Sequence, residues 1–238
     1  MTHLRPDLLP GLLRAAARNQ ARGFADMALF EVGPVFHGGE PGDQHSHATG
    51  LLIGQSAARD TFASRRPLDL YDAKADAEAT LAAIGAPLRT QITRKTPEWF
   101  HPGRAGVIAL GPNTLATYGE LHPRVLAAMD IKGPALAFNI LLANVPLPKI
   151  KTPTKPALTL RDLQAVERDF AFVVDTKVEA LTLVNAALGA DKTLIESARV
   201  FDQFTGDKAE AQMGAGKKSL AITVRLQPQD NAWSLKAS

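Results

Sequence analysis

Two histidine–proline pairs, His101–Pro102 and His122–Pro123, are the first candidates for chemistry in this sequence. Histidine is the commonest general acid and base, so such a pair could serve in hydrolysis or in metal binding. Either chemistry needs a nucleophile or further ligands, and no HExxH or GxSxG motif accompanies the pair. Both histidines also have a structural interpretation, because Pro102 favours extended backbone before it and Pro123 suits the first turn of a helix. We predict structural roles for both, in preference to catalysis by this pair.

Two further motifs contain the residue types of ligand-binding sites but lack the number or spacing of residues that such sites require. His45 and His47 would lie on one face of an extended segment, but two imidazoles are too few for a metal site, and the surrounding residues predict a loop before a strand. We therefore expect no metal site. The stretch GAGKKS at 214–219 departs from the phosphate-binding loop GxxxxGK[ST], because Ala211 stands where its first glycine is required. It also opens a predicted strand instead of a helix whose N-terminus would face phosphate.

The stretch RDFAFVVD at 168–175 fits much of the RNA-recognition octapeptide and departs from it at Asp169 and Asp175. In a strand, Arg168, Phe170 and Phe172 share one face, which is the arrangement of a platform on which unpaired bases stack. The alternative is that the two rings pack in a core beneath helices. The order of elements favours that alternative, because the octapeptide lies here on the first strand of its domain, whereas RNA-recognition modules carry it on the third.

Composition limits the class of protein. The 238 residues suffice for two domains, and 45% hydrophobic with 21% charged residues excludes a mainly disordered chain. The chain has no cysteine, so it holds no disulfide or thiolate metal site, and we expect a cytoplasmic location. No apolar run reaches the roughly 18 residues of a membrane span, so we expect no membrane contact. The net charge of +3 is too small to identify a nucleic-acid partner by itself.

A proline-rich segment with basic residues and no acid divides the chain. We predict a first domain over 1–145, a linker over 146–165 and a second domain over 166–238. The first domain has a predicted helix over 6–23, a second over 71–84 and short strands at hairpin spacing, which indicates an α+β domain with a largely antiparallel sheet. The second domain reads strand, helix, strand, a loop at 205–216 and strand, the first part of a ferredoxin-like unit. Its final helix and strand are missing from the pattern, so we expect one face of its sheet to be uncovered.

Several stretches, in matching order and spacing, carry a resemblance to a known family. They are LRPDLLPGLL at 4–13, LFEVGPVF at 29–36, FHPGR at 100–104, GELHP at 119–123, and RDFAFVVD followed by VFDQFTG and GKKSLAITVRLQ. Through them the chain resembles the C-terminal third of the bacterial phenylalanyl-tRNA synthetase beta subunit, over about 4–228.

The resemblance implies a class II synthetase-like first domain that has lost catalysis, and a ferredoxin-fold anticodon-binding second domain that contacts tRNA(Phe). It also implies a catalytic alpha subunit as partner, in a heterotetramer, with ATP and Mg²⁺ bound there and no cofactor on this chain. The residues agree, because the motif-two-like strand LFEVG has no arginine to hold the ATP α-phosphate and no GxGxxR occurs. Our candidates for RNA phosphate contacts, chosen by charge, are Lys149, Lys151, Lys155, Arg168, Lys217, Lys218 and Arg225.

Two other functions stay open on sequence alone. One is a free-standing adenylating enzyme that uses His101 and His122. The other is a stand-alone RNA-binding or regulatory paralogue without a role in aminoacylation. The late start relative to the family also leads us to expect that the chain is a fragment of a larger subunit.

Overall fold

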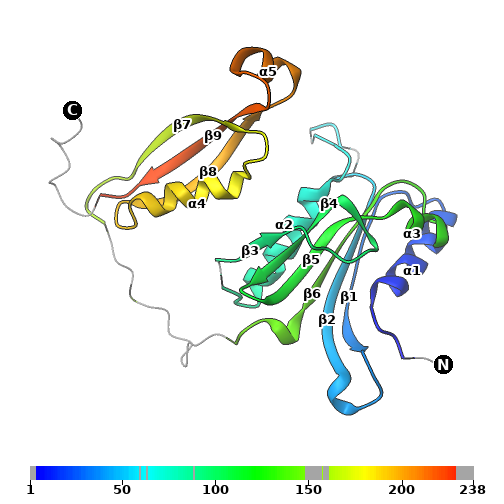
Figure 1. Ribbon diagram of the computed structural model, residues 1–238. Helices are drawn as coiled ribbons and strands as arrows, with labels where there is room; N and C mark the ends of the chain where they lie inside the picture. Colours follow the sequence, from blue (N-terminus) through cyan, green and yellow to red (C-terminus); the bar gives the residue numbers. More distant parts are fainter. Residues whose placement is uncertain are drawn as a thin grey trace, which may run out of the picture. The chain divides into compact units, whose positions relative to one another are not determined.

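The computed structural model describes residues 4–58, 60–62, 64–87, 89–147, 157 and 161–228 (Figure 1). Within it the chain divides into two compact units, Met1–Pro153 and Thr154–Ser238. The candidates Lys149, Lys151 and Lys155 lie outside the described residues.

The first unit is built on a six-stranded antiparallel sheet of order β1-β2-β6-β5-β4-β3. Its strands are β1 (Met27–Phe36), β2 (Gln44–Ile53), β3 (Gln91–Thr93), β4 (Phe100–Leu110), β5 (Asn113–Leu121) and β6 (Ala135–Leu141), and its α-helices are α1 (Leu9–Ala21), α2 (Leu70–Ala83) and α3 (Pro123–Ala128). Short 3-10 helices lie at Pro41–Asp43 and Leu142–Asn144.

Helices cover both faces of this sheet, with α1 and α3 on one face and α2 on the other (Figure 1). Strand alternation explains why both faces are apolar. Leu51 of β2 and its partner Ala137 of β6 face α1, whereas Leu52 and its partner Leu136 face α2. The central strands are therefore buried between two helical layers, and the unit has a core on each side of the sheet.

Local sequence fixes the ends of these elements. The Asp7 carboxylate accepts the backbone N–H of Leu9 at 2.7 Å where α1 begins, and Gly23 with φ of 91° ends that helix. Asp69 and Asp72 form a capping box at the start of α2. The β4–β5 hairpin turns at Gly111, whose φ of 59° suits glycine.

The second unit is a three-stranded antiparallel sheet of order β7-β9-β8 with two helices. Its elements are β7 (Val166–Asp175), α4 (Ala180–Ala190), β8 (Ile195–Phe204), α5 (Asp207–Met213) and β9 (Lys217–Leu226). The third strand in sequence thus lies between the first two, as in the ferredoxin-like arrangement. β7 is an edge strand of the described sheet.

The predicted α+β class with antiparallel sheets is confirmed, and so are the helices expected near 6–23 and 71–84. Two local predictions are wrong. His45 and His47 lie inside β2, because the strand begins at Gln44 and pairs with β1 through Val35↔His45. The expected loop at 205–216 contains α5, whose residues DKAEAQM are mostly good helix formers. Among the described residues, no helix is long and apolar enough to cross a membrane.

Candidate nucleic-acid interface

The β7 strand places one cation and two aromatic rings on the same face of the second sheet. Alternation puts Arg168, Phe170 and Phe172 on this face, and their cross-strand partners in β9 are Val224, Ile222 and Leu220. The rings of Phe170 and Phe172 are 6.3 Å apart between centroids, with 34° between their planes. They are 46% and 40% exposed. The two rings are therefore neighbours, and both are accessible to solvent.

The expectation that these rings pack beneath helices is wrong for the described residues. The partners Leu220, Ile222 and Val224 are buried, and β9 is contacted by both α4 and α5. β7 lies on the far side of β9 from β8, so α4 leaves its rings half uncovered.

The candidate cations of the second unit do not form one cluster. Arg168 and Lys218 belong to the face of Phe170, whereas Lys217 and Arg225 belong to the opposite face, as the β7–β9 register shows. Lys218 is 8% exposed, so little of its side chain meets solvent.

Ion pairing separates these cations further. The Arg225 guanidinium lies 2.6 Å from Glu196 and 3.6 Å from Glu167, and hydrogen bonding to Glu196 raises its pKa. The Lys217 ammonium lies 2.5 Å from Asp175. Arg168 donates to the Glu167 carbonyl at 3.3 Å and pairs with no carboxylate among the described residues. Of the candidates that the structure describes, Arg168 is therefore the exposed cation most available to an external phosphate.

Sequence reasoning missed a second basic surface, on α1 of the first unit. Arg14, Arg18 and Arg22 follow one another at intervals of four residues, so they share a helix face, and all three are exposed. None of them forms an ion pair with a described residue, and a shallow hollow is lined by Ala15, Arg18, Asn19 and Arg22. The signal was present in the sequence, as three arginines at four-residue spacing before the helix-ending Gly23.

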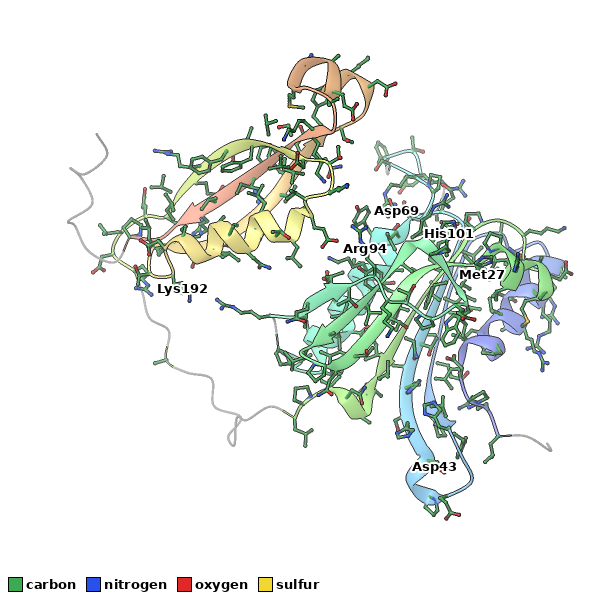
Figure 2. All side chains as sticks on the ribbon, viewed as in Figure 1. Met27, Asp43, Asp69, Arg94, His101 and Lys192 are labelled. Atoms are coloured by element: carbon green, nitrogen blue, oxygen red, sulfur yellow. The ribbon has the colours of Figure 1, made fainter. Side chains whose placement is uncertain are left out.

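The two histidines of the opening motif hold backbone turns. The His101 Nδ1 accepts the N–H of Gly103 at 3.1 Å at the start of β4, where Figure 2 labels His101. The His122 Nδ1 accepts the N–H of Arg124 at 3.1 Å and caps α3. These bonds give both histidines the structural roles that their neighbouring prolines suggested.

The motif-two-like strand also makes a structural pair. Glu31 of β1 forms an ion pair with Arg5, and the Arg5 Nε donates to the carbonyl of Pro34 at 2.9 Å. The contact ties the segment before α1 to the edge strand of the sheet. Among the described residues, no group of three or more His, Asp or Glu side chains is placed to hold a metal ion.

Comparison with known proteins identifies the class of the second unit first. Residues 162–234 match the family model of the ferredoxin-fold anticodon binding domain. Residues 1–142 match the family model described as the phenylalanyl tRNA synthetase beta chain CLM domain. The chain belongs to this phenylalanyl tRNA synthetase beta chain family, and the resemblance seen in its motifs is confirmed.

Curated relatives agree with the family models. The chain is similar to the phenylalanine–tRNA ligase beta subunits of Cereibacter sphaeroides (78% identity), Ruegeria pomeroyi (66%) and Rhodospirillum rubrum (50%). Each alignment covers 97% of this chain but only 28–29% of the relative. The chain thus spans less than a third of the length of these relatives. A solved pyrrolysyl tRNA synthetase of Desulfitobacterium hafniense aligns over 58% of this chain and 47% of that one at 16% identity, and its TM-score of 0.42 is too low to support an argument.

Proposed function

We propose that this chain is a non-catalytic part of a phenylalanyl-tRNA synthetase beta subunit that binds the anticodon region of tRNA(Phe) through its second unit. The observation that carries the proposal is Arg168, which pairs with no described carboxylate, beside the exposed rings of Phe170 and Phe172, in a unit that matches an anticodon-binding family. Arginine binds phosphate through paired N–H donors, and unpaired bases stack on aromatic rings. An anticodon loop supplies both groups.

The first unit supports a catalytic alpha subunit in this proposal, within a heterotetramer in the cytoplasm. ATP and Mg²⁺ bind at the alpha subunit, and this chain holds neither. The bonds of His101 and His122 to backbone N–H groups favour a scaffold role over the adenylating alternative. A chain that adenylated phenylalanine without the alpha subunit would contradict the assignment, and ATP–pyrophosphate exchange measures it.

The RNA interface is tested by a matched pair of variants in the 238-residue chain. Arg168→Gln removes an unpaired cation, whereas Arg225→Gln removes a cation that two carboxylates already neutralise. Fluorescence anisotropy of a labelled tRNA(Phe) anticodon stem-loop, measured over a salt series, gives the affinity and its salt dependence. We expect Arg168→Gln to weaken binding and to reduce the magnitude of the salt slope by about 0.7, the value for one phosphate on a single strand.

The two variants also locate the face. Equal effects of Arg168→Gln and Arg225→Gln would contradict the choice of the β7 aromatic face. A larger effect of Arg225→Gln would place the RNA on the opposite face of the sheet. Circular dichroism of each variant controls for loss of fold.

The alternative of a stand-alone RNA-binding or regulatory paralogue is distinguished by the partner. Fusion of this chain to the upstream part of a related beta subunit, co-expressed with an alpha subunit, should yield a co-purifying complex. RNA binding without any association with an alpha subunit would support the paralogue.

A further inference from the structure

The sheet face that carries α1 and α3 holds a cavity of about 750 Å³ in the first unit. Its walls come from the start of α1, from the segment 95–99 before β4 and from α3, and its floor from the central strands. Leu13, Val107 and Leu141 represent its mainly apolar lining. A volume of this size falls within the roughly 300–1,000 Å³ of small-molecule sites, which combine apolar walls with a few fixed polar groups.

Two polar side chains of the lining are buried, His47 and Thr117, and the His47 ring has a nitrogen without a hydrogen-bond partner among the described residues. His47 is 6% exposed, and its Nδ1 lies 3.3 Å from the Asn139 Nδ2. The Asn139 Oδ1 accepts the Thr49 hydroxyl at 2.8 Å, which orients the amide so that its N–H₂ group faces His47. The imidazole Nδ1 is then the acceptor and Nε2–H is a donor. No described residue forms a hydrogen bond with this Nε2.

The deep part of the cavity is uncharged. Burial lowers the pKa of His47, against an opposing effect of Asp7 and with a further lowering by His37 and His45, so the ring is neutral at pH 7. The lining includes no arginine among the described residues. Of its two charged groups, Lys95 is exposed and the Asp7 carboxylate already accepts the N–H of Leu9. A phosphate or carboxylate would therefore find no buried cation here.

We propose that this cavity binds a compact, uncharged aromatic or branched apolar molecule that offers one hydrogen-bond acceptor to the Nε2–H of His47. The apolar walls remove the body of the ligand from water, and the hydrogen bond from the His47 imidazole fixes the orientation of the ligand. This ligand class differs from the anionic nucleotides of an adenylation site. The inference concerns the first unit alone and does not depend on RNA binding by the second.

Fluorine NMR of three probes with the 238-residue chain tests the class of ligand. The probes are 4-fluoroacetophenone, which has a neutral acceptor, fluorobenzene, which has none, and 4-fluorobenzoate, which is charged. We expect 4-fluoroacetophenone to bind most tightly. His47→Phe keeps an aromatic ring but removes the donor, so it should weaken binding of this ketone roughly fivefold, the effect of one neutral hydrogen bond, and leave fluorobenzene unchanged. His101→Phe is the matched control, because His101 does not line the cavity.

Filling the cavity tests the location. Val107→Phe adds volume at the floor and Met129→Trp adds it at the end of α3, so each should abolish binding of the ketone; the second variant serves if the first does not fold. Binding that survives both substitutions would overturn the site. Equal affinity for the three probes would overturn the ligand class. Loss of probe binding when this chain is fused to the upstream part of a related beta subunit would assign the cavity to a protein segment and overturn the small-molecule proposal.

Discussion

Substitution of Thr117 and of Thr49 by the same residue should change the free energy of unfolding in opposite directions, which makes a stability test. Both lie opposite Asn139 in the sheet, on its two neighbouring strands, and they are 6% and 2% exposed. The Thr49 hydroxyl donates to the Asn139 Oδ1 at 2.8 Å. The Thr117 Oγ1 is buried and is the one such side-chain atom without a hydrogen-bond partner among the described residues. One hydroxyl is thus satisfied and the other is not.

The substitution to valine has nearly the same shape as threonine and replaces the hydroxyl by a methyl group. A buried polar group without a partner costs about 1–3 kcal/mol, so Thr117→Val should raise the free energy of unfolding of the first unit by about 1 kcal/mol. Thr49→Val removes a hydrogen bond and leaves the Asn139 Oδ1 unpaired, so it should lower that free energy by about 1–2 kcal/mol. The two variants should therefore differ by roughly 2–3 kcal/mol.

Urea unfolding followed by tryptophan fluorescence measures both values. Trp99 belongs to the first unit, and a Trp233→Phe background removes the second of the two tryptophans, so the signal reports on that unit alone. If Thr117→Val destabilises as much as Thr49→Val, the Thr117 hydroxyl has a partner such as a bound water, and the reasoning fails. A change in the urea dependence of one variant would instead indicate altered compactness.

Three further predictions concern the basic helix, the aromatic pair and the buried histidine. Replacing Arg14, Arg18 and Arg22 together by glutamine should reduce the magnitude of the salt slope for RNA binding by about 2, whereas triple replacement by lysine should preserve it; an unchanged slope in the glutamine variant would remove α1 from the interface. Phe172→Leu should weaken binding of single-stranded RNA by about 1–3 kcal/mol without changing the salt slope, since stacking involves no counterion release; a changed slope would contradict stacking. Burial lowers the pKa of His47 below its ordinary 6.5, so the unfolded chain binds the proton more readily than the folded chain. The free energy of unfolding therefore keeps its full value above pH 6.5 and decreases as the pH falls below 6.5. This loss, measured by urea unfolding across pH, should be smaller in His47→Phe, and identical pH profiles would exclude His47 as its source.

Local patterns in the sequence were enough to predict the main elements. The leucines of α1 and the acidic cap of α2 are decided by neighbouring residues, and the alternation of 168–175 predicts which side chains share a face of β7. The α5 helix was missed because its glycine-rich flanks resemble a loop. His45 and His47 were missed as strand residues because their pairing with β1 involves backbone contacts across a hairpin and not side-chain type.

Charge alone could not predict which candidate cations are available to bind an RNA phosphate. Arg225 is neutralised by Glu167 and Glu196. These carboxylates lie beside it because β9 is placed between β7 and β8 in the sheet. Lys218 is buried by the same arrangement, while Arg168 has no ion pair with the part of the chain that the structure describes. Such differences depend on strand order and register, which bring together residues far apart in the chain. The cavity beneath α1 depends likewise on packing between distant segments.

Binding of tRNA(Phe) to the 238-residue chain, compared with binding of a tRNA(Phe) whose anticodon bases are replaced, tests the central claim most directly. At one fixed salt concentration, both RNAs present the same number of phosphates, so a difference in affinity reports on base recognition. We predict tighter binding of the native anticodon, with the difference reduced in a Phe170→Leu, Phe172→Leu variant. Equal affinity for the two RNAs would contradict anticodon recognition by the second unit.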